Sequence, residues 1–588
     1  MRLTVIIVVD RASWSYLSGL NPAGMHINVI SMRKHPEIGG KKGELMHIYA
    51  GSTKTRRVRT TNCCYDVKLG SLGGTFMALM GIDIGTSGAK VILVNEDGEV
   101  MVRVTEEYPS SSPKPQWSEQ NPGDWWKFSC SAIRKALSDS TIKPDEITGI
   151  GLSGQMVGLV VLDERGEVIR PCIMWNDQRS AAEADELTQR IGRRKILQET
   201  SNPIFATFVA PKIVWMKNNE PELYGKICHV LLPKDYVAYR LTGEIATEVS
   251  DASGTCLFDV RNRGWSDEMI RQIGIPQEWL PTCRESDEET GRLSAEASGQ
   301  TGLSQGTIVI AGGGDQAAQA LGTGIVKAGL CSVTIGTSGV VFTQTDRHRE
   351  HPEGVLHSFC HSVHDQWFLM GVMLSAGGSF QWFRNTLRGF SKTDSPDYDK
   401  LTALAAEAPP GCEGLVFLPY LTGERCPYDD PSARGGWIGL TQRHEIAHMT
   451  RAVMEGITFG LFDSLQAMSE LGSPINTVYA SGGAAQSPMW RQMLADVFDV
   501  EITRTNSTEG AAFGAAILAG IGTGVFSDAE QAADAMVRIT DRVEPQRQLK
   551  NLYADTYGVY HSLYPQLKES FGRLTSLATQ SENNQFKG

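Results

Sequence analysis

A five-residue string, Ile-Gly-Thr-Ser-Gly, occurs twice in the chain, at residues 84–88 and 335–339. In both copies a segment rich in β-forming residues leads into the string, and a second such segment, residues 91–94 or 340–342, leaves it. This pattern predicts two β-hairpins with small, hydroxyl-bearing tips. Glycines let a backbone approach a ligand closely, and exposed N–H and hydroxyl groups at such a tip suit phosphate oxygens. Two such tips in two halves of one chain predict a nucleotide held in a cleft between duplicated domains.

A single Gly-Thr-Ser-Gly turn is more often only a turn than a phosphate site. The prediction therefore depends on the repetition, and on the acid Asp83 just before the first copy. The sequence contains neither the Gly-x-x-x-x-Gly-Lys-Ser/Thr phosphate loop nor the dinucleotide fingerprint on a βαβ unit.

Length and composition limit the class of protein. A chain of 588 residues is too long for one core, so two domains of a few hundred residues are expected. The net charge of −12 argues against nucleic acid as the main partner. The 11 cysteines lack the paired spacing of metal sites and are interpreted as reduced, which is typical of a cytoplasmic enzyme. No apolar run is long enough to span a bilayer, so no membrane partner is expected.

Residues 1–76 differ from the rest, because they hold eleven Lys and Arg against four Asp and Glu. The apolar run at residues 3–9 is too short and too poorly flanked for a signal peptide. We expect a basic, poorly ordered extension, with Met77 or Met80 as the natural beginning. A targeting sequence and a partner-binding arm are the alternatives.

From Met80 onward, hairpins followed by helices indicate an α/β domain with a mixed sheet. Residues 147–153 have the composition of a buried strand, and residues 454–468 are apolar at helical spacing, as in a core helix. The C-terminal segment is predicted to be helical to about Leu577, with a polar tail over residues 576–588.

The chain resembles the FGGY family of carbohydrate kinases, and within it the D-xylulose kinases. The similarity runs from about Met77 to the end, and residues 1–76 lie outside it. The matching stretches are residues 81–88, 117–120, 153–156, 175–177, 231–236, 250–255, 312–315, 335–339, 423–425, 482–484 and 490–496.

The resemblance implies two duplicated actin-like ATPase (ribonuclease H-like) domains around a cleft, an N-terminal one at 77–324 and a C-terminal one at 325–575. It also implies ATP and Mg²⁺ as cofactors, and phosphorylation of a small sugar, in the first place D-xylulose to D-xylulose 5-phosphate. A homodimer is a candidate assembly.

Asp315 is the candidate catalytic base. It follows an apolar strand, residues 307–311, and three glycines, which would leave its carboxylate facing the cleft. From the pattern alone, an Asp that caps the following helix is equally plausible. The resemblance favours the base, since the family's base occupies this motif.

Asp83 is the second candidate catalytic carboxylate and the candidate metal ligand. At a strand end beside the first tip, it is placed to hold Mg²⁺ directly or through water. The alternative is an Asp that bonds its own backbone in a turn. The family has an activity-critical acid here, which favours metal or phosphate positioning.

The predicted nucleotide-binding residues come from three turns. The first tip contributes Thr86 and Ser87, and the second contributes Gly336 and Thr337. The resemblance adds the family's adenosine loop at Gly482 and Gly483, with Ser487 toward the adenine. Pattern alone does not separate that loop from an ordinary strand-to-helix turn.

The predicted sugar-binding residues are Gln155, Met156 and Val157, together with Asp315 and the neighbouring Gln316. The xylulose kinases have the motif Gly-Gln-Met-His-Gly, whose His helps to bind the ketose. This chain has Val157 at the position of that His. Valine offers no side-chain hydrogen bond, so this departure puts D-xylulose itself in doubt. Asp251 fits a buried turn equally well and receives no role, and Trp175 to Asp177 are only weakly linked to the pocket.

Three alternatives remain open at this stage. The first is a kinase for another pentulose, gluconate or glycerol. The second is an actin-like nucleotide-binding assembly protein, and the third is a catalytically silent relative. Four histidines at 351, 357, 361 and 364 are interpreted as strand and loop residues rather than metal ligands.

Overall fold

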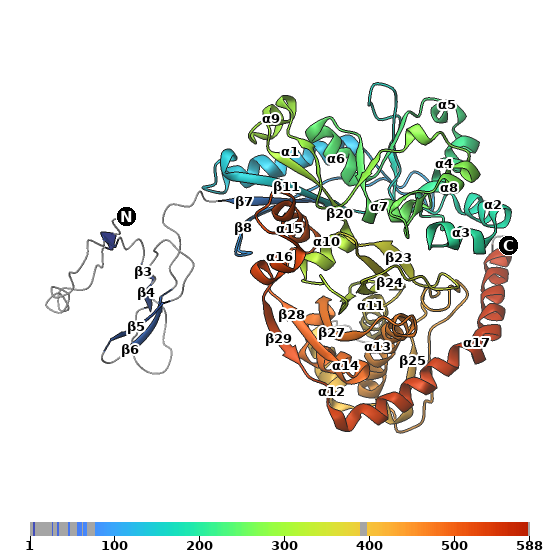
Figure 1. The fold of residues 1–588 in the computed structure, drawn as a ribbon. Coiled ribbons are helices and arrows are strands. Elements are labelled where there is room, and N and C mark those ends of the chain that lie inside the picture. Colours follow the sequence, from blue (N-terminus) through green and yellow to red (C-terminus); the bar gives the residue numbers. More distant parts are fainter. Residues whose placement is uncertain are drawn as a thin grey trace. The chain divides into compact units, whose positions relative to one another are not determined.

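The computed structural model describes residues 77–388 and 397–585, together with six short strands nearer the N-terminus (Figure 1). The chain divides into two compact units, Met1–Met77 and Ala78–Gly588, which are considered separately. The strands of the first unit are β1 (Thr4–Val5), β2 (His26–Ile27), β3 (Met32–Arg33), β4 (Leu45–Met46), β5 (Arg56–Thr60) and β6 (Cys63–Val67). The predicted poor order of residues 1–76 otherwise concerns residues outside the described ones.

The first half of the second unit contains a six-stranded sheet in the order β19-β20-β11-β7-β8-β9. Its middle strands β20, β11 and β7 are parallel, and the outer pairs are antiparallel. The strands are β7 (Ala78–Ile84), β8 (Gly88–Asn95), β9 (Val100–Glu107), β11 (Ile147–Gly154), β19 (Glu289–Arg292) and β20 (Ile308–Gly314). The mixed sheet expected from alternating hairpins and helices is confirmed.

The second half contains a seven-stranded sheet in the order β23-β24-β22-β21-β27-β28-β29. Here β21, β27 and β28 are parallel and the outer pairs are antiparallel. The strands are β21 (Gly329–Ile335), β22 (Gly339–Thr345), β23 (His357–Cys360), β24 (Trp367–Met373), β27 (Ile475–Gly482), β28 (Glu501–Thr505) and β29 (Ile539–Val543).

The two sheets repeat one arrangement. Strands β9-β8-β7-β11-β20-β19 correspond in pairing and direction to β24-β22-β21-β27-β28-β29, and β23 is an additional edge strand beside β24. The two Ile-Gly-Thr-Ser-Gly strings connect β7 to β8 and β21 to β22, which are equivalent hairpins in this correspondence. The duplication predicted from the repeated string is therefore confirmed.

Helices cover both faces of the first sheet. One face packs on α1 (Pro122–Ser138) and α6 (Pro233–Thr242), whose side chains share a core with Met80, Ile82 and Ile84 of β7. The opposite face packs on α15 (Ala511–Gly522) and α16 (Ala529–Met536), which share a core with Leu79 and Ile310. Figure 1 shows α15 and α16, with α10 (Asp315–Gly322), between the two sheets.

The second sheet has one face covered by its own helices, with α13 (Ile446–Glu470) at the centre of the core, as the apolar pattern predicted. The other helices on this face are α11 (Gly377–Arg388), α12 (Tyr398–Glu407), α14 (Pro488–Phe498) and α17 (Lys550–Gln585). Helix α17 extends beyond the predicted end near Leu577 and through the first part of the predicted polar tail.

The remaining described helices and two-stranded ribbons of the second unit lie outside the two large sheets. The helices are α2 (Ala181–Ile191), α3 (Arg193–Thr200), α4 (Val209–Asn219), α5 (Pro221–Tyr224), α7 (Val249–Ala252), α8 (Asp267–Ile273) and α9 (Ala295–Thr301). The two-stranded ribbons pair β10 (Glu119–Gln120) with β13 (Cys172–Ile173), β12 (Val160–Leu162) with β14 (His229–Leu231), β15 (Ala246–Glu248) with β18 (Thr282–Arg284), β16 (Phe258–Asp259) with β17 (Gly264–Trp265), and β25 (Val416–Leu418) with β26 (Gly436–Ile438).

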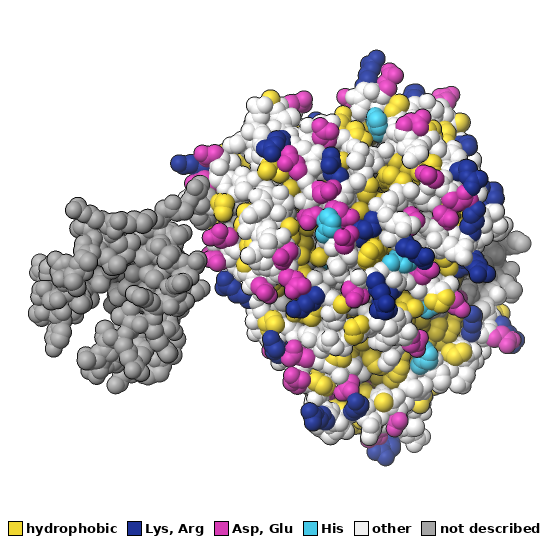
Figure 2. Space-filling model, viewed as in Figure 1, with side chains coloured by type: hydrophobic (Ala, Val, Ile, Leu, Met, Phe, Trp, Pro, Cys, Tyr) yellow, Lys and Arg dark blue, Asp and Glu magenta, His cyan; other side chains and the backbone are white. Residues whose placement is uncertain are grey.

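Charged side chains of both signs are interspersed over the face drawn in Figure 2, with no continuous basic area among the described residues of that view. None of the described helices combines the length and the apolar character that crossing a bilayer requires.

Candidate active site

Both repeated strings form exposed hairpin tips. In the first, the Gly85 N–H donates to the Gly88 carbonyl at 3.1 Å, and Ile84 pairs with Ala89. In the second, the Gly336 N–H donates to the Ser338 carbonyl at 3.0 Å, and Ile335 pairs with Gly339. The same five-residue string thus closes two hairpins whose pairing differs by one residue. The Thr and Ser residues of both tips are exposed to solvent.

The first tip is held by three side chains from different segments. The Gln120 side-chain amide donates to the Thr86 carbonyl at 2.7 Å, and the Trp175 indole N–H donates to the Thr86 hydroxyl at 3.0 Å. The Tyr108 hydroxyl donates to the Gly85 carbonyl. Sequence reasoning missed Tyr108 and Gln120 and linked Trp175 only weakly to the pocket, although Gln120 and Trp175 lie in stretches that carry the family resemblance.

Asp83 and Asp315 lie at the same edge of the first sheet. Asp83 is the next-to-last residue of β7, and its register partner on β11 is Ser153, which in turn pairs with Gly313 of β20. Two strand spacings separate β7 from β20, so Asp83 and Gly313 are about 10 Å apart, and Asp315 follows two residues later. Carboxyl ends of parallel strands are where ligands bind in such sheets, so this placement agrees with the predicted roles.

Burial, and then the negative charge of Asp83, raise the pKa of Asp315 to about 7. Burial also raises the pKa of Asp83, while the Lys90 ammonium and the Ser153 hydroxyl oppose that increase. A carboxylate with a pKa near the working pH has the proton affinity that suits a general base. No described residue hydrogen-bonds Asp83 Oδ1, which leaves a carboxylate oxygen of the type Mg²⁺ prefers.

Two of the three glycines before Asp315 make room for β11 and for the residues that follow it. Gly312 has φ +82, and a Cβ there would lie 1.9 Å from the Leu152 carbonyl oxygen. A Cβ on Gly314 would lie within 3.0 Å of the Met156 side chain. Asp315 is the first residue of α10, and the residue at the cap position is Gly314. The structure therefore does not use Asp315 as the helix cap, the alternative that the sequence left open.

A buried polar brace fixes this strand end. The Gly314 N–H donates to the Ser250 hydroxyl at 3.0 Å, and Ser250 donates to the Glu248 carboxylate at 2.9 Å. Ser286 binds the same carboxylate at 2.6 Å, and its carbonyl accepts the Gly312 N–H at 3.0 Å. The backbone that carries Asp315 is thus bonded on both sides to one carboxylate.

The predicted sugar loop lies beside this strand end. The Gln155 N–H continues the sheet by donating to the Ile84 carbonyl at 2.9 Å, and its side chain donates to Gln120 Oε1 at 2.9 Å. No described residue hydrogen-bonds Gln155 Oε1, although the side chain is buried. Gln155 therefore links the sugar loop to the first hairpin tip through Gln120.

Val157 has φ +56, a left-handed conformation that is unusual for a β-branched residue. Its carbonyl accepts a hydrogen bond at 2.8 Å from Lys212, a fully buried lysine that also donates to the Met174 carbonyl at 2.8 Å. Burial lowers the pKa of Lys212 to about 7. The Val157 side chain packs against Gly254 and the apolar core, so the loop is held by backbone contacts from Lys212.

A pocket of about 360 Å³ brings together four of the predicted nucleotide residues, Gly336, Thr337, Gly483 and Ser487. Its apolar wall consists of Phe380, Tyr398 and Trp490, with ring centroids 5.3 to 5.7 Å apart for the pairs that include Phe380. Sequence reasoning gave these aromatics no role, although Trp490 lies in a stretch that carries the family resemblance, because they come from three separate helices.

Gly482 lines an adjoining pocket together with Gly483. Its φ is +84, and a Cβ there would lie 2.4 Å from the Ile335 carbonyl oxygen, so the adenosine loop predicted at Gly482 needs glycine for close strand packing. Thr86 and Ser87 belong to the first hairpin and do not line the pocket that contains Gly336 and Thr337.

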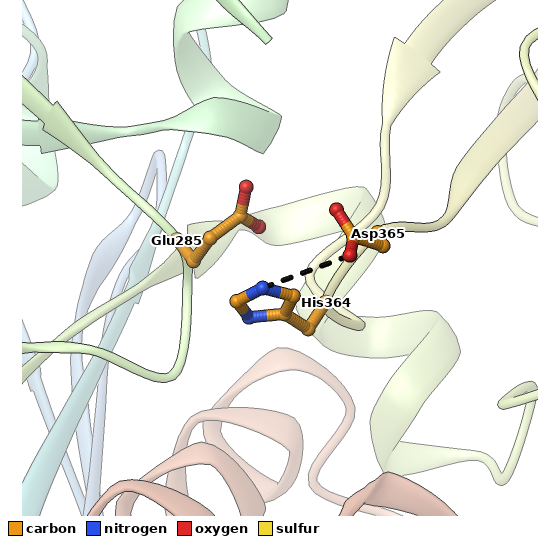
Figure 3. A group of neighbouring side chains, drawn as sticks. All are labelled: Glu285, His364 and Asp365. Atoms are coloured by element: carbon orange, nitrogen blue, oxygen red, sulfur yellow. Dashed lines mark ion pairs between the residues drawn. The ribbon is translucent and has the colours of Figure 1, made fainter.

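Glu285, His364 and Asp365 bring their ligand atoms within 4.8 Å of one another (Figure 3). The Glu285 carboxylate is already engaged by Arg263, whose Nε donates to it at 2.7 Å. His364 lies 3.4 Å from Asp287 and 3.9 Å from Asp365. The group is explained by ion pairing, in agreement with the interpretation of His364 as a loop residue rather than a metal ligand.

The duplicated sheets and the two hairpin tips define the class of this fold, the actin-like ATPase fold. Residues 78–322 match the FGGY family of carbohydrate kinases, N-terminal domain, and residues 331–523 match the C-terminal domain of the same family. The chain belongs to the FGGY family of carbohydrate kinases.

Relatives agree with this assignment. The chain is 39% identical over 491 residues to the xylulose kinase of Bacillus subtilis (strain 168). The aligned residues cover 84% of this chain and 97% of that protein. It is 42% identical over 443 residues to the xylulose kinase of Escherichia coli (strain K12), covering 75% and 89%. A crystal structure described as a xyloylose kinase from Brucella ovis superposes with a TM-score of 0.78 at 37% identity, covering 84% of this chain and 99% of that one.

Proposed function

We propose that this chain is an ATP-dependent kinase that phosphorylates D-xylulose to D-xylulose 5-phosphate. The observation that carries the proposal is the pair Asp83 and Asp315, at the carboxyl ends of β7 and β20. Beside them lies the loop that contains Gln155, which is linked by hydrogen bonds through Gln120 to the first hairpin tip. The choice of D-xylulose rests on the relatives described above, which are xylulose kinases.

Asp315 acts as the general base. Its carboxylate takes the proton of the terminal hydroxyl while that oxygen attacks the γ-phosphorus of ATP. The bond between the γ-phosphorus and the β,γ-bridging oxygen breaks, and ADP leaves with the electron pair. The brace from Glu248 through Ser250 and Ser286 keeps the backbone of Asp315 in place during this transfer.

The two hairpin tips bind the phosphates of ATP, the first tip through Thr86 and Ser87 and the second through Gly336 and Thr337. The adenosine lies in the aromatic pocket near Gly482, Gly483 and Ser487. Asp83, whose Oδ1 accepts no hydrogen bond from a described residue, is the residue that would hold Mg²⁺. When bound, this ion neutralises charge that develops on the phosphates.

Gln155, Met156, Val157 and Gln316 form the sugar side of the site beside Asp315. Because Val157 lacks the hydrogen bond of a His, discrimination among ketoses rests on the other polar groups of the pocket. Another pentulose, gluconate or glycerol is the alternative substrate, and an assembly protein that binds nucleotide is the non-enzymatic alternative.

The test is a panel of ketoses, polyols and gluconate in a coupled assay of ADP release. D-xylulose is expected to give the highest kcat/KM, and Asp315→Asn is expected to lower kcat by about 100-fold or more. A different preferred sugar would change the substrate, whereas ATP binding without sugar-stimulated ADP release would contradict the kinase proposal itself.

A further inference from the structure

Asp251 is a buried carboxyl group that the mechanism above does not use. It lies on α7, is fully buried, and receives no hydrogen bond from any described residue on either Oδ1 or Oδ2. A buried carboxyl group that makes no hydrogen bond is unfavourable relative to one that does, so such a group needs an explanation.

The neighbouring acid shows the contrast. Glu248, three residues earlier, accepts hydrogen bonds from the Ser250 N–H at 2.7 Å, the Asp251 N–H at 2.9 Å, and the Ser250 and Ser286 hydroxyls. The same short segment therefore supplies three donors to Glu248, with a fourth from Ser286, and none to the side chain of Asp251. The nearest cation is Lys234, whose Nζ is 3.8 Å from Asp251 Oδ2, beyond hydrogen-bond distance.

Lys234 is committed to other acids. Its Nζ lies 2.6 Å from Asp235 and 3.3 Å from Glu248, and all of these side chains are buried. One ammonium thus faces three carboxyl groups. Asp235 and Glu248 accept hydrogen bonds and Asp251 accepts none from a described residue, and burial raises the pKa of Asp251 well above its ordinary value. A protonated carboxyl can both donate and accept.

The residues on either side of Asp251 in the chain contact the active site. Ser250 accepts the Gly314 N–H, next to Asp315, and Gly254 packs against Val157 of the sugar loop. Asp251 also feels the charge of Asp315 directly. This carboxyl, which accepts no hydrogen bond from a described residue, therefore lies between the strand end that carries the base and the loop that faces the sugar.

We propose that Asp251 is a further sugar-binding residue, whose carboxyl group hydrogen-bonds a hydroxyl of the ketose that Asp315 activates elsewhere on the molecule. A ketopentose carries several hydroxyl groups, each a donor and an acceptor, and matches this kind of site. The inference rests on the proposed function, and it supplies a polar contact in a pocket where Val157 provides none.

The experiment compares Asp251→Leu, which keeps the branched shape without hydrogen bonds, with Asp251→Asn, which keeps a donor and an acceptor. In the full chain, Asp251→Leu should raise KM for D-xylulose on the order of 10- to 100-fold, with KM for ATP unchanged. Asp251→Asn should raise it by less. The ratio of kcat/KM between D-xylulose and its C3 epimer D-ribulose should approach 1 in the Leu variant.

Asp463→Asn is the matched control. Asp463 is also buried and has one oxygen without a described partner, but it lies on α13 and bonds Tyr557 and His561. This variant should leave KM for D-xylulose unchanged. If Asp251→Leu does not fold, Asp251→Ala gives the same readout from a smaller side chain.

An unchanged KM and epimer ratio in folded Asp251 variants would overturn the inference, as would a loss of kcat at constant KM, which would mean that Asp251 only positions Asp315. Wild-type protein that phosphorylates no ketose would instead overturn the proposed function.

Discussion

Asp315 combines a catalytic task with a cost in stability. Its folded-state pKa of about 7 lies above its ordinary value of 3.8, so the folded chain holds this proton more tightly than the unfolded chain does. The carboxyl therefore contributes stability below about pH 4, and this contribution is lost as the pH rises through 7. The same raised pKa suits proton abstraction near neutrality.

Asp315→Asn should lower kcat by about 100- to 10,000-fold, because the amide does not accept the hydroxyl proton. Wild-type kcat/KM should rise with pH through about 7, where the base ionises. At pH 8 the Asn variant should have a higher Tm than wild type, and the difference should vanish below pH 4. Calorimetry and initial rates across pH test this, and a variant that is active or less stable at pH 8 would contradict it.

Val157 occupies a left-handed conformation that His tolerates better than a β-branched residue. Val157→His should therefore relieve backbone strain and supply a hydrogen bond to the ketose. We expect kcat/KM for D-xylulose to rise about 10-fold, the equivalent of one hydrogen bond of about 1.4 kcal/mol. Lower kcat/KM together with a lower Tm would mean that the space beside Gly254 does not admit an imidazole.

At the residue scale, the sequence predicted what local pattern encodes. The acids at 83 and 315 follow strands and precede glycines or a helix, so their positions could be inferred. The partners could not, because Tyr108, Gln120 and Trp175 reach the first tip from separate segments. The left-handed backbone of Val157 and the burial of Lys212 depend on tertiary contacts that no local pattern reveals.

At the element scale, α15 is the helix that joins the two halves. A Cβ on Gly81 or Gly151 would lie 2.0 or 1.8 Å from carbonyl oxygens of α15, and one on Gly514 would lie 1.8 Å from the Ala318 carbonyl of α10. Glycines on the sheet and on the helix thus allow close backbone approach, which the sequence shows only as scattered glycines.

Gly514→Ala should destabilise the chain by about 3 kcal/mol or more, because the methyl group meets backbone atoms that cannot move aside. Gly558→Ala is the control, since Gly558 lies in helix α17 with open space around it. That variant should gain up to about 1 kcal/mol from helix propensity. Denaturant unfolding measures both, and equal effects of the two substitutions would show that α10 and α15 do not pack so closely.

The existence of helices and strands was predicted better than the residues at which they end. The repeated hairpins and the core helix α13 were inferred correctly from alternation and helical spacing. The C-terminal helix continues to Gln585, although the polar composition predicted a tail. The packing of α15 on the first sheet, across the predicted boundary at 324, is a long-range contact that sequence order conceals.

At the scale of the whole molecule, the halves of the second unit are joined by polar contacts at β23 as well as by α15. The Asn202 side chain donates to the Ser358 carbonyl at 2.8 Å and accepts its N–H at 3.1 Å, and the Ser253 hydroxyl accepts the Cys360 N–H at 3.0 Å. Side chains of the first half thus satisfy the edge strand of the second sheet. Shared cores and a paired edge favour folding of residues 78–588 as one cooperative body.

Because residues 78–588 form one unit, we can predict the effect of removing residues 1–76, which lie outside the family match that begins at residue 78. All the proposed site residues belong to the unit Ala78–Gly588. A variant that begins at Met77 should therefore keep kcat, both KM values and Tm within about 2-fold or 2 °C of the full chain, since a separate unit contributes little to the stability of its neighbour. Kinetics and calorimetry on both forms test this. A loss of activity, or a changed oligomeric mass by light scattering, would instead show that the basic segment supports the kinase or its assembly.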